Sequence, residues 1–584
     1  MKINQFIHRR EWLLVLVAVL SIVAQVYLDL KVPEYMENIT LTISTPGSEL
    51  RDVTSDGTLM LAAALASMVC AIITGFCTAI FGTTLARRMR AGVYNKTFDL
   101  SSAEVNHIGT DSLITRSTND VTQVQMFVVM GLQMSVKAPI MAVWASSKIA
   151  TQSLTWTIPT GIAVLATLLV LGVAMGLAIP RMMRMQKITD RLNRVTREHL
   201  TGLRVIRAYT TGDFHEERFE EVNTDLRNTT LFVNSTMAFI MPLLTAIMTG
   251  LSLSIYVLGA VLIDGTADLT ERVTLFGQMV VFSTYALQVV TSFMMMTVIF
   301  VMGPRALVAW RRIREVLSTK PAIVDGGASA GVAPAGSLEF RDVSFRYPEA
   351  DGDALHSISF TAAPGEVVAI IGSTGSGKST LVNLIPRFAD VREGSVLVDG
   401  VDVRDWNQKD LRNRLAYVPQ KSVLFSGSVA SNLALGEGLR PVTPEDVVAA
   451  AHAAAAAEFV GKKEDGYASA VAQNGKNFSG GQRQHLSMAR AFARGGEIMI
   501  FDDSFSALDY KTERDIRSQL KNSAKGATIV VVAQRIGTVR EADKILVLDK
   551  GRLVGSGTHE ELLATNEVYQ DIALSQLSEE ELRS

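Results

Sequence analysis

The stretch Gly372-Ser373-Thr374-Gly375-Ser376-Gly377-Lys378-Ser379 decides how the second half of this chain folds. It follows the apolar, β-branched run Val367–Ile371 and precedes a run of helical pattern that begins near Thr380. Glycines at these places let backbone N–H groups turn inward around phosphate oxygens, and the start of the helix adds its positive dipole end. We therefore expect a phosphate-binding loop between a strand and a helix. The alternative, a turn rich in glycine and serine without a ligand, is disfavoured by the flanking strand and helix.

The last residues of such a loop have defined tasks. Lys378 is expected to reach the β- and γ-phosphates of a nucleotide, and the Ser379 hydroxyl is expected to ligate Mg²⁺. Asp502 ends the apolar run Ile498–Asp502, and a buried strand would deliver its carboxylate to the Mg²⁺ side of the phosphates. We therefore predict ATP and Mg²⁺ as cofactors. The predicted nucleotide-binding residues of this segment are Gly372, Ser373, Thr374, Gly375, Ser376, Gly377, Lys378, Ser379 and Thr380.

The residues around the loop alternate between strand and helix patterns. Short strand-like runs occur at Val367–Ile371, Ser395–Val398, Glu497–Phe501, Thr528–Val532 and Lys544–Leu548. This alternation predicts an α/β domain with a mainly parallel sheet and helices on both faces. The alanine-rich run Ala449–Ala457 predicts a small helical subdomain, because alanine is the strongest helix former. We place this domain at residues 338–584, after a linker at residues 320–337 that is rich in glycine, alanine and proline.

The part of the chain before this linker contains six apolar stretches, each close to the ~20 residues needed to cross a bilayer. They lie at roughly Trp12–Leu30, Leu59–Phe81, Met126–Ser147, Leu154–Ile179, Phe232–Ile263 and Leu275–Met302. They predict a six-helix α-helical transmembrane domain at residues 1–319. The alternative is a large soluble domain with buried helices, and the charges of the connections argue against it.

Basic residues flank these stretches on one side. His8, Arg9 and Arg10 precede the first stretch, and the long connections 82–125 and 180–231 are basic and helix-patterned. We therefore predict a multi-pass protein of the cell (plasma or inner) membrane whose N-terminus, long connections and second domain are cytoplasmic. The first stretch is too long for a signal peptide and lacks a small-residue cleavage pattern, so we interpret it as a retained helix. The net charge of −2 gives no reason to expect nucleic acid as a partner.

Lys137 lies within the third apolar stretch, and Lys148 directly follows it. Lys148 is expected to extend its ammonium toward the outer surface of the membrane. Lys137 is either a functional charge inside the membrane or a residue near the cytoplasmic boundary of a helix that runs well past the bilayer. We favour the second interpretation.

The run Phe478-Ser479-Gly480-Gly481-Gln482, followed by the helical pattern Arg483–Phe492, carries a specific resemblance. It resembles the signature of the ABC transporter family, which distinguishes ABC ATPases from other phosphate-loop enzymes. In that family two cassettes pack head to tail, and each signature covers the nucleotide held by the other cassette. The resemblance implies that Ser479 and Gly481 present a hydroxyl and an N–H group to a γ-phosphate. Predicted nucleotide-binding residues here are Ser479, Gly480, Gly481 and Gln482.

Further positions follow the order of the same family. Tyr347 resembles the aromatic residue that stacks on adenine, although alone it would be interpreted as an edge-strand tyrosine. Gln420 resembles the glutamine that meets Mg²⁺ or the attacking water, and Asp509 lies in a segment similar to the loop that crosses to the partner cassette. The segments 109–120 and 209–219 resemble the cytoplasmic coupling helices of exporters. The resemblance thus implies an α/β phosphate-loop ATP-binding cassette after the membrane domain, with Ser379, Gln420 and Asp502 at the metal.

Two positions depart from the family pattern. Where the family usually has the glutamate that activates the hydrolytic water, this chain has Asp503, whose side chain is one methylene shorter. Catalysis needs hydrogen-bond reach, and a displacement near 1 Å can cost about 10²-fold in rate. Where the family usually has histidine, this chain has Gln534, which cannot carry the charge of an imidazolium. Asp503, Gln534 and Gln420, the predicted catalytic residues, would therefore form a site that binds nucleotide but hydrolyses it poorly.

The intact signature, however, would serve a partner's pocket. We therefore expect one subunit of a heterodimeric ABC exporter, similar to bacterial multidrug exporters, with a second half-transporter, the lipid bilayer and a small amphipathic substrate as partners. A lipid or a peptide is an alternative cargo. Two further hypotheses are a homodimer with slow hydrolysis through Asp503 and an ATP-gated channel or regulator. The membrane half excludes a soluble DNA-repair ATPase with the same cassette.

Overall fold

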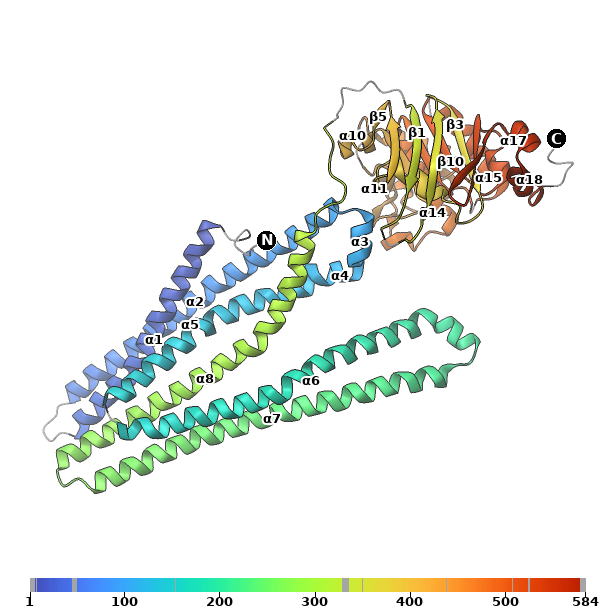
Figure 1. Ribbon diagram of the computed structural model, residues 1–584. Helices are drawn as coiled ribbons and strands as arrows, with labels where there is room; N and C mark the ends of the chain where they lie inside the picture. The colour runs from blue at the N-terminus through green and yellow to red at the C-terminus, as the bar shows by residue number, and fades with distance from the viewer. Residues whose placement is uncertain are drawn as a thin grey trace. The chain divides into compact units, whose positions relative to one another are not determined.

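A computed structural model describes residue 6 and residues 8–44, 50–152, 154–327, 336–348, 350–436, 438–506, 508–523 and 526–577 (Figure 1). The chain divides into two compact units. The first comprises Met1–Thr97 and Ile108–Thr319, and the second comprises Phe98–His107 and Lys320–Ser584. Residues 328–335 of the predicted linker lie outside the described residues.

The first unit is built from long apolar helices (Figure 1). They are α1 (Arg9–Ser44), α2 (Leu50–Asp99), α5 (Val121–Gln152), α6 (Leu154–Ala208), α7 (Gly212–Asp264) and α8 (Leu269–Ser318), with the short α4 (Thr110–Thr115) before α5. Within the described residues, six helices are long and apolar enough to cross a membrane, which confirms the predicted transmembrane fold. Helices α2, α6, α7 and α8 have 50 to 55 residues, more than the ~20 that span a bilayer, so they continue well beyond it.

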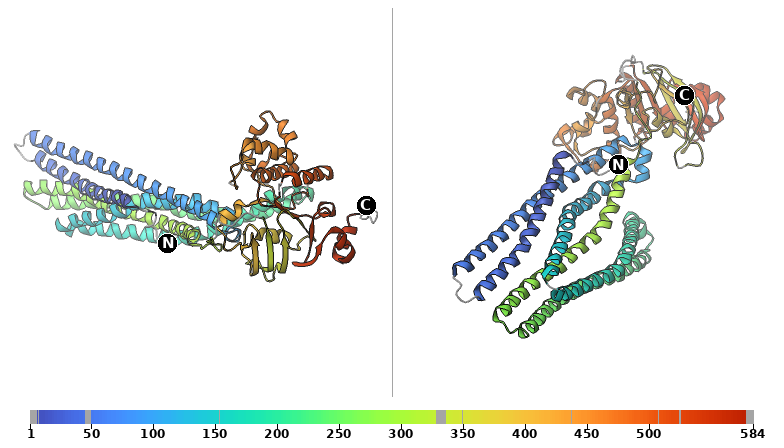
Figure 2. Two further views of the ribbon diagram at one scale, coloured as in Figure 1. Left: turned by 90° about the horizontal axis from the view of Figure 1, so that it is seen from above. Right: turned by 60° about the vertical axis from the view of Figure 1, so that its left-hand side comes forward.

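Helices α6 and α7 form an antiparallel pair, and Figures 1 and 2 show them side by side along their length. Apolar contacts among Ile188, Val195 and Val222 hold the pair together beyond its apolar stretches. At the other end, Trp156 of α6 stacks on Phe282 of α8, with ring centroids 5.4 Å apart. This stacked pair belongs to a core that α1, α5, α6, α7 and α8 share.

A π-helical turn, Arg116–Asp120, lies between α4 and α5. Both of its end residues are buried. Arg116 donates to the carbonyl of Arg312 at 3.0 Å and pairs with Glu315 at 2.9 Å, while Arg312 pairs with Asp120 at 3.4 Å. These bonds fix the start of the third membrane-spanning helix against α8.

Both membrane lysines form ion pairs with α1. Lys148 pairs with Glu34 at 2.7 Å, and Lys137 pairs with Asp29 at 3.2 Å. Lys137 lies midway along α5, which runs from Val121 to Gln152. The favoured interpretation, a position near the cytoplasmic boundary of a helix that runs well past the bilayer, stays a prediction. A carboxylate on the neighbouring helix balances the charge of Lys137.

The second unit contains a six-stranded sheet with the order β12-β11-β3-β10-β9-β6. The strands from β11 to β6 are parallel and β12 is antiparallel. Their bounds are β3 (Val367–Gly372), β6 (Leu415–Val418), β9 (Ile498–Asp502), β10 (Thr528–Val532), β11 (Lys544–Asp549) and β12 (Arg552–Gly557). Helices α14 (Gly480–Arg494), α15 (Tyr510–Ser523), α17 (His559–Thr565) and α18 (Glu567–Leu574) accompany this sheet. The mainly parallel α/β cassette is confirmed.

The predicted strand at Ser395–Val398 belongs to a different sheet. It is β4 (Glu393–Val398), which pairs antiparallel with β1 (Leu338–Phe345) and β5 (Val401–Asp402). With β2 (Leu355–Ala362) they form a four-stranded antiparallel sheet, and Phe340 stacks on Phe360 across it with centroids 4.6 Å apart. A turn of two residues joins β4 to β5, and so short a connection permits antiparallel pairing only.

The alanine-rich segment forms the predicted helical subdomain. Its helices are α11 (Val429–Leu433), α12 (Pro444–Ala453) and α13 (Ala457–Gly461), and α11 and α12 pack on α14. Thr443 caps α12 by accepting from the N–H of Asp446.

Parallel pairing brings the functional segments to one edge of the six-stranded sheet. Ile370 of β3 and Asp502 of β9 both lie opposite Val532 of β10, and Val418 of β6 lies opposite Phe501. The segments that follow these four strands therefore leave the sheet at its carboxyl edge, where α/β proteins bind their ligands.

Candidate nucleotide-binding site

The phosphate-binding loop connects β3 to α9 (Lys378–Leu384). Gly377 precedes the helix with φ of +99°, and a Cβ atom there would lie 2.8 Å from Leu355 Cδ2. Only glycine meets both demands without strain. The Lys378 Nζ donates to the carbonyl oxygens of Gly372 and Ser373, at 2.8 Å each. Burial lowers the pKa of the Lys378 ammonium, and the carboxylates of Asp503 and Asp502 oppose this shift.

Ser379 and Asp502 meet at the end of β9. The Ser379 hydroxyl donates to Asp502 Oδ1 at 2.8 Å. Asp502 is buried, which raises the pKa of its carboxyl, whereas the bond from Ser379 lowers it. Hydroxyl and carboxylate oxygens are ligands that Mg²⁺ accepts, and this ion usually takes one or two carboxylates together with substrate phosphates. Ser379 and Asp502 therefore fit a magnesium ion that also binds the phosphates of a nucleotide.

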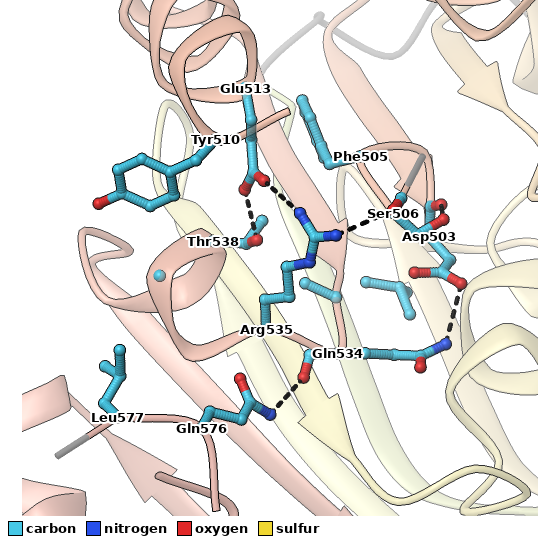
Figure 3. A pocket seen from close by; sticks show the side chains of 13 residues that line it. Asp503, Phe505, Ser506, Tyr510, Glu513, Gln534, Arg535, Thr538, Gln576 and Leu577 are labelled. Carbon is cyan, nitrogen blue, oxygen red and sulfur yellow. Dashed lines mark hydrogen bonds and ion pairs between the residues drawn. The ribbon is translucent and has the colours of Figure 1, made fainter. Parts of the chain in front are cut away.

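Asp503 is held by two glutamines. Its Oδ2 accepts a 2.9 Å bond from Nε2 of Gln534 and a 3.3 Å bond from Nε2 of Gln420 (Figure 3 shows the first of these). Its backbone N–H donates to the carbonyl of Val532 at 3.1 Å. The predicted catalytic residues thus come together from three strand ends, and they are bonded directly to one another.

A cavity of about 430 Å³ brings the phosphate loop and these residues together. It is lined by Tyr347, Asp353, Ala354, Thr374, Gly375, Gly377, Lys378, Ser379, Thr380, Gln420, Asp503, Val532, Gln534, Lys550 and Gly551. Tyr347 is half exposed, and its hydroxyl lies 3.0 Å from Thr380 Oγ1. An exposed ring beside a phosphate loop is a suitable platform for a base.

The signature residues lie elsewhere. Ser479 caps α14: its Oγ accepts from the N–H of Gln482, and its N–H donates to Oε1 of Gln482. Ser479 and Gly480 are exposed, and neither they, Gly481 nor Asp509 line the cavity at the phosphate loop. Within one chain the helix start therefore presents its N–H groups outward.

Comparison with known proteins agrees with this geometry. Residues 12–305 match the transmembrane region of ABC transporters, and residues 355–506 match the ABC transporter ATP-binding family. The chain belongs to the ABC transporter family. An uncharacterized ABC transporter ATP-binding protein of Mycobacterium tuberculosis is 38% identical over 525 residues, which are 89% of this chain and 88% of the relative. The ABC transporter YfiB of Bacillus subtilis, also uncharacterized, is 34% identical over 91% of both chains.

Two further matches bear on the type of ABC transporter. The ATP-dependent lipid A-core flippase of Pseudomonas aeruginosa is 32% identical over 85% of this chain and 81% of that protein. A solved bacterial Atm1-family ABC exporter with ATP bound has the same fold, with a TM-score of 0.80, 24% identity, and coverage of 98% and 100% of the two chains. The chain is therefore an ATPase-coupled ABC transporter with an exporter fold, and it crosses the membrane several times.

Part of this ABC transporter's nucleotide cavity was not predicted from the sequence. Asp353, Ala354, Lys550 and Gly551 line it, and none of them belongs to a predicted motif. Lys550 is exposed, with φ of +44°, in the turn between β11 and β12. The run Asp549-Lys550-Gly551 between two strand patterns is a turn signal, but nothing local places that turn beside the phosphate loop.

A second cavity of the ABC transporter's cassette, of about 570 Å³, shares Asp503, Val532 and Gln534 with the first, and Figure 3 shows the residues that line it. Gln576, just after α18, spans the backbone there: its Nε2 donates to the carbonyl of Gln534 at 2.8 Å, and its Oε1 accepts from the N–H of Ile536 at 2.9 Å. Arg535 donates to the carbonyls of Ser506 and Leu508, at 3.2 Å each. The segment that carries Gln534 is thus tied to two other parts of the cassette.

Proposed function

We propose that this chain is one subunit of a heterodimeric ATP-driven exporter. Its own phosphate loop forms a degenerate ATP site, and its Ser479 and Gly481 complete the competent site of a different subunit. ATP binding would close the two cassettes and turn the membrane cavity outward, and hydrolysis at the competent site would reset it. The N-terminus and the cassette would lie in the cytoplasm.

The bonding of Asp503 carries this proposal. A general base must reach the attacking water within about 3 Å, and both amides that surround Asp503 donate to the same carboxylate oxygen. The family usually has a histidine at the position of Gln534. A protonated histidine carries a positive charge, whereas the amide of Gln534 is neutral. The site therefore holds groups that suit nucleotide binding, while its base is short and already bonded to neighbouring side chains.

The signature supports the other half of the proposal. The capping box at Ser479 orders the start of α14, a helix of 15 residues, and leaves its first N–H groups exposed. ABC exporters act as dimers, so the start of α14 in one chain is suited to bind the phosphates of a nucleotide held by the phosphate loop of a second chain.

The test is ATPase activity of the chain purified alone and co-purified with a neighbouring half-transporter. We expect little activity alone and strong activity in the pair. Ser479→Arg in this chain should abolish the activity of the pair, because an arginine side chain would block the helix start. Full activity of the chain alone would overturn the proposal.

A homodimer with slow hydrolysis is the second candidate. It is favoured by the position of Asp503, which lines the same cavity as Lys378 and Ser379. In that case the chain alone would hydrolyse ATP, and Asp503→Asn would abolish this activity.

For the cargo, we propose an amphipathic compound. The relative named as a lipid A-core flippase makes a lipid a reasonable form of it, beside a drug-like molecule or a peptide. ATP-dependent accumulation in inside-out vesicles would support export. Ion current without accumulation against a gradient would instead indicate an ATP-gated channel.

A further inference from the structure

Polar side chains from four membrane-spanning helices converge around Asp29 of α1. Lys137 of α5 pairs with its Oδ2 at 3.2 Å, and Ser67 of α2 donates to its Oδ1. Gln288 of α8 donates to its backbone carbonyl at 3.4 Å. Asp29 and Lys137 both lie 15 residues before the ends of their helices, Ser44 and Gln152, which is about 22 Å along the axis at about 1.5 Å per residue.

A cavity of about 230 Å³ opens beside this cluster, between α5 and α8. Lys137 and Met141 line it from α5, and Thr284, Gln288, Thr291 and Met295 line it from α8. The cavity is thus polar near Lys137 and apolar at its two methionines. Cavities for whole small molecules usually measure about 300–1,000 Å³, so this one has room for the headgroup of an amphiphile.

Residues that line this cavity already form hydrogen bonds with the backbone and with a neighbouring side chain. These bonds determine which donors and acceptors of the cavity wall remain for a ligand. The hydroxyls of Thr284 and Thr291 donate to the carbonyls of Val280 and Leu287 in their own helix, so they face a ligand as acceptors. The Oε1 of Gln288 is buried without a hydrogen-bond partner in the described structure. Lys137 has three N–H donors, and Asp29 accepts from one of them. The wall therefore combines one cationic donor with several neutral acceptors.

We propose that this cavity binds the headgroup of the cargo, and that the headgroup carries an anionic phosphate or carboxylate oxygen next to hydroxyl or amide donors. The anion bonds to the ammonium of Lys137, one N–H of which Asp29 already accepts. The donors bond to Gln288 Oε1 and to the threonine hydroxyls, while Met141 and Met295 contact the adjoining alkyl group. This inference rests on the proposed export function and narrows its substrate class.

The test measures binding to the full transporter in neutral detergent, by calorimetry and without ATP. The probes are dihexanoyl-phosphatidylglycerol, which has an anion and hydroxyl donors, dihexanoyl-phosphatidic acid, which lacks the hydroxyls, and dihexanoyl-phosphatidylcholine, which adds a cation. We expect phosphatidylglycerol to bind best. The double variant Asp29→Asn/Lys137→Met keeps the buried charge balanced and should weaken its binding on the order of tenfold or more, as expected for the loss of a charge-assisted hydrogen bond.

Two single variants sharpen the test. Asp29→Asn frees an N–H of Lys137 and should tighten binding severalfold, whereas a merely structural ion pair predicts no gain. Lys148→Met removes the matched lysine of α5 that pairs with Glu34 of α1 at 2.7 Å but does not line the cavity, and it should leave binding unchanged.

Equal binding by all variants, or preference for phosphatidylcholine, would overturn the proposal. Lysine-dependent binding of soluble glycerol 3-phosphate would support the same chemistry with a water-soluble cargo. Failure here is distinguishable from failure of the proposed function, because the ATPase asymmetry of the pair is measured without any probe.

Discussion

Asp503 adopts a left-handed backbone conformation, with φ of +48°. Aspartate and asparagine tolerate this region better than longer side chains do. The substitution that shortens the base therefore also suits the backbone on which it stands. At the scale of the residue, the shorter side chain of Asp503 therefore has two effects: its carboxylate reaches less far toward water, and its backbone is less strained.

Restoring the usual side chains should restore hydrolysis. Asp503→Glu/Gln534→His returns a longer base and a chargeable neighbour, and the turnover of the chain's own site should rise about 10- to 100-fold. The rate is measured in pairs whose partner site is inactivated. Asp503→Glu alone is the control and should recover less, because Gln534 still donates to the carboxylate. No gain in the double variant would contradict the interpretation of the site as degenerate.

We expect the buried carboxylate of Asp502 to lower the stability of the folded cassette, although it contributes to the binding of Mg²⁺-ATP. Because the pKa of its carboxyl is raised by burial, the folded cassette retains this proton to higher pH than the unfolded chain does, and the cost of the buried charge is fully present above the raised pKa. Without Mg²⁺ and nucleotide, Asp502→Asn should stabilise the protein at neutral pH by on the order of 1 kcal/mol. Thermal melts should show this gain shrinking as the pH falls through the raised pKa, while Mg²⁺-ATP affinity drops. A lower melting temperature of the variant at neutral pH would contradict it.

At the scale of the element, a residue just after α18 forms hydrogen bonds with the segment between β10 and α16 (Ile536–Val539). The amide of Gln576 bridges the carbonyl of Gln534 and the N–H of Ile536. Gln576 does not line the nucleotide cavity, so it acts on the site only through the backbone that carries Gln534.

Gln576→Ala should therefore separate binding from turnover. We expect unchanged ATP affinity, faster hydrogen exchange at residues 533–536, and a loss of about 1–2 kcal/mol of local stability for two hydrogen bonds. Turnover in the pair should fall. Gln570→Ala is the matched control, since Gln570 belongs to α18 and its side chain donates to the carbonyl of Leu563 nearby. Equal effects of both variants would mean that α18 matters only for folding.

The sequence predicted elements whose signals are local and failed where distant segments meet. The phosphate loop at 372–379, the strand ending at Asp502 and the capped start of α14 each carry their pattern within a few residues. The placement of Lys550 beside the loop, the bond from Gln576 to Gln534 and the pairing of Lys137 with Asp29 each join segments far apart in the chain. Hydrophobic periodicity contains no information on such pairs.

At the scale of the whole molecule, a short piece of the membrane half belongs to the compact unit of the cassette. This piece, Phe98–His107, contains most of α3 (Ser102–Ile108). The carboxylate of Glu104 accepts from the N–H of Ser101 at 2.5 Å and from the N–H of Ala322, in the segment after α8, at 2.7 Å. Glu104 thus joins the segment just after α2 to the segment just after α8, within the unit that holds the cassette.

Glu104→Ala should therefore uncouple the transporter. ATPase activity of the pair should remain within about twofold, because the nucleotide cavity is unchanged, while transport into inside-out vesicles should fall by a larger factor. Glu561→Ala is the matched control: Glu561 also accepts from the N–H of a helix cap, Thr558, at 2.9 Å, but within its own helix start. Parallel loss of both activities in Glu104→Ala would point to misfolding.

The π-helical turn at Arg116–Asp120 sets the angular phase of the helix that follows it. Each residue of an α-helix advances about 100° around the axis, and a π turn contains one residue more than an α turn. If the same residues formed ordinary α-helix instead of this turn, all of α5 would therefore rotate by about 100° around its axis. Lys137 would then leave Asp29 and face a different neighbour, so the ion pair between α5 and α1 depends on a five-residue irregularity that precedes α5.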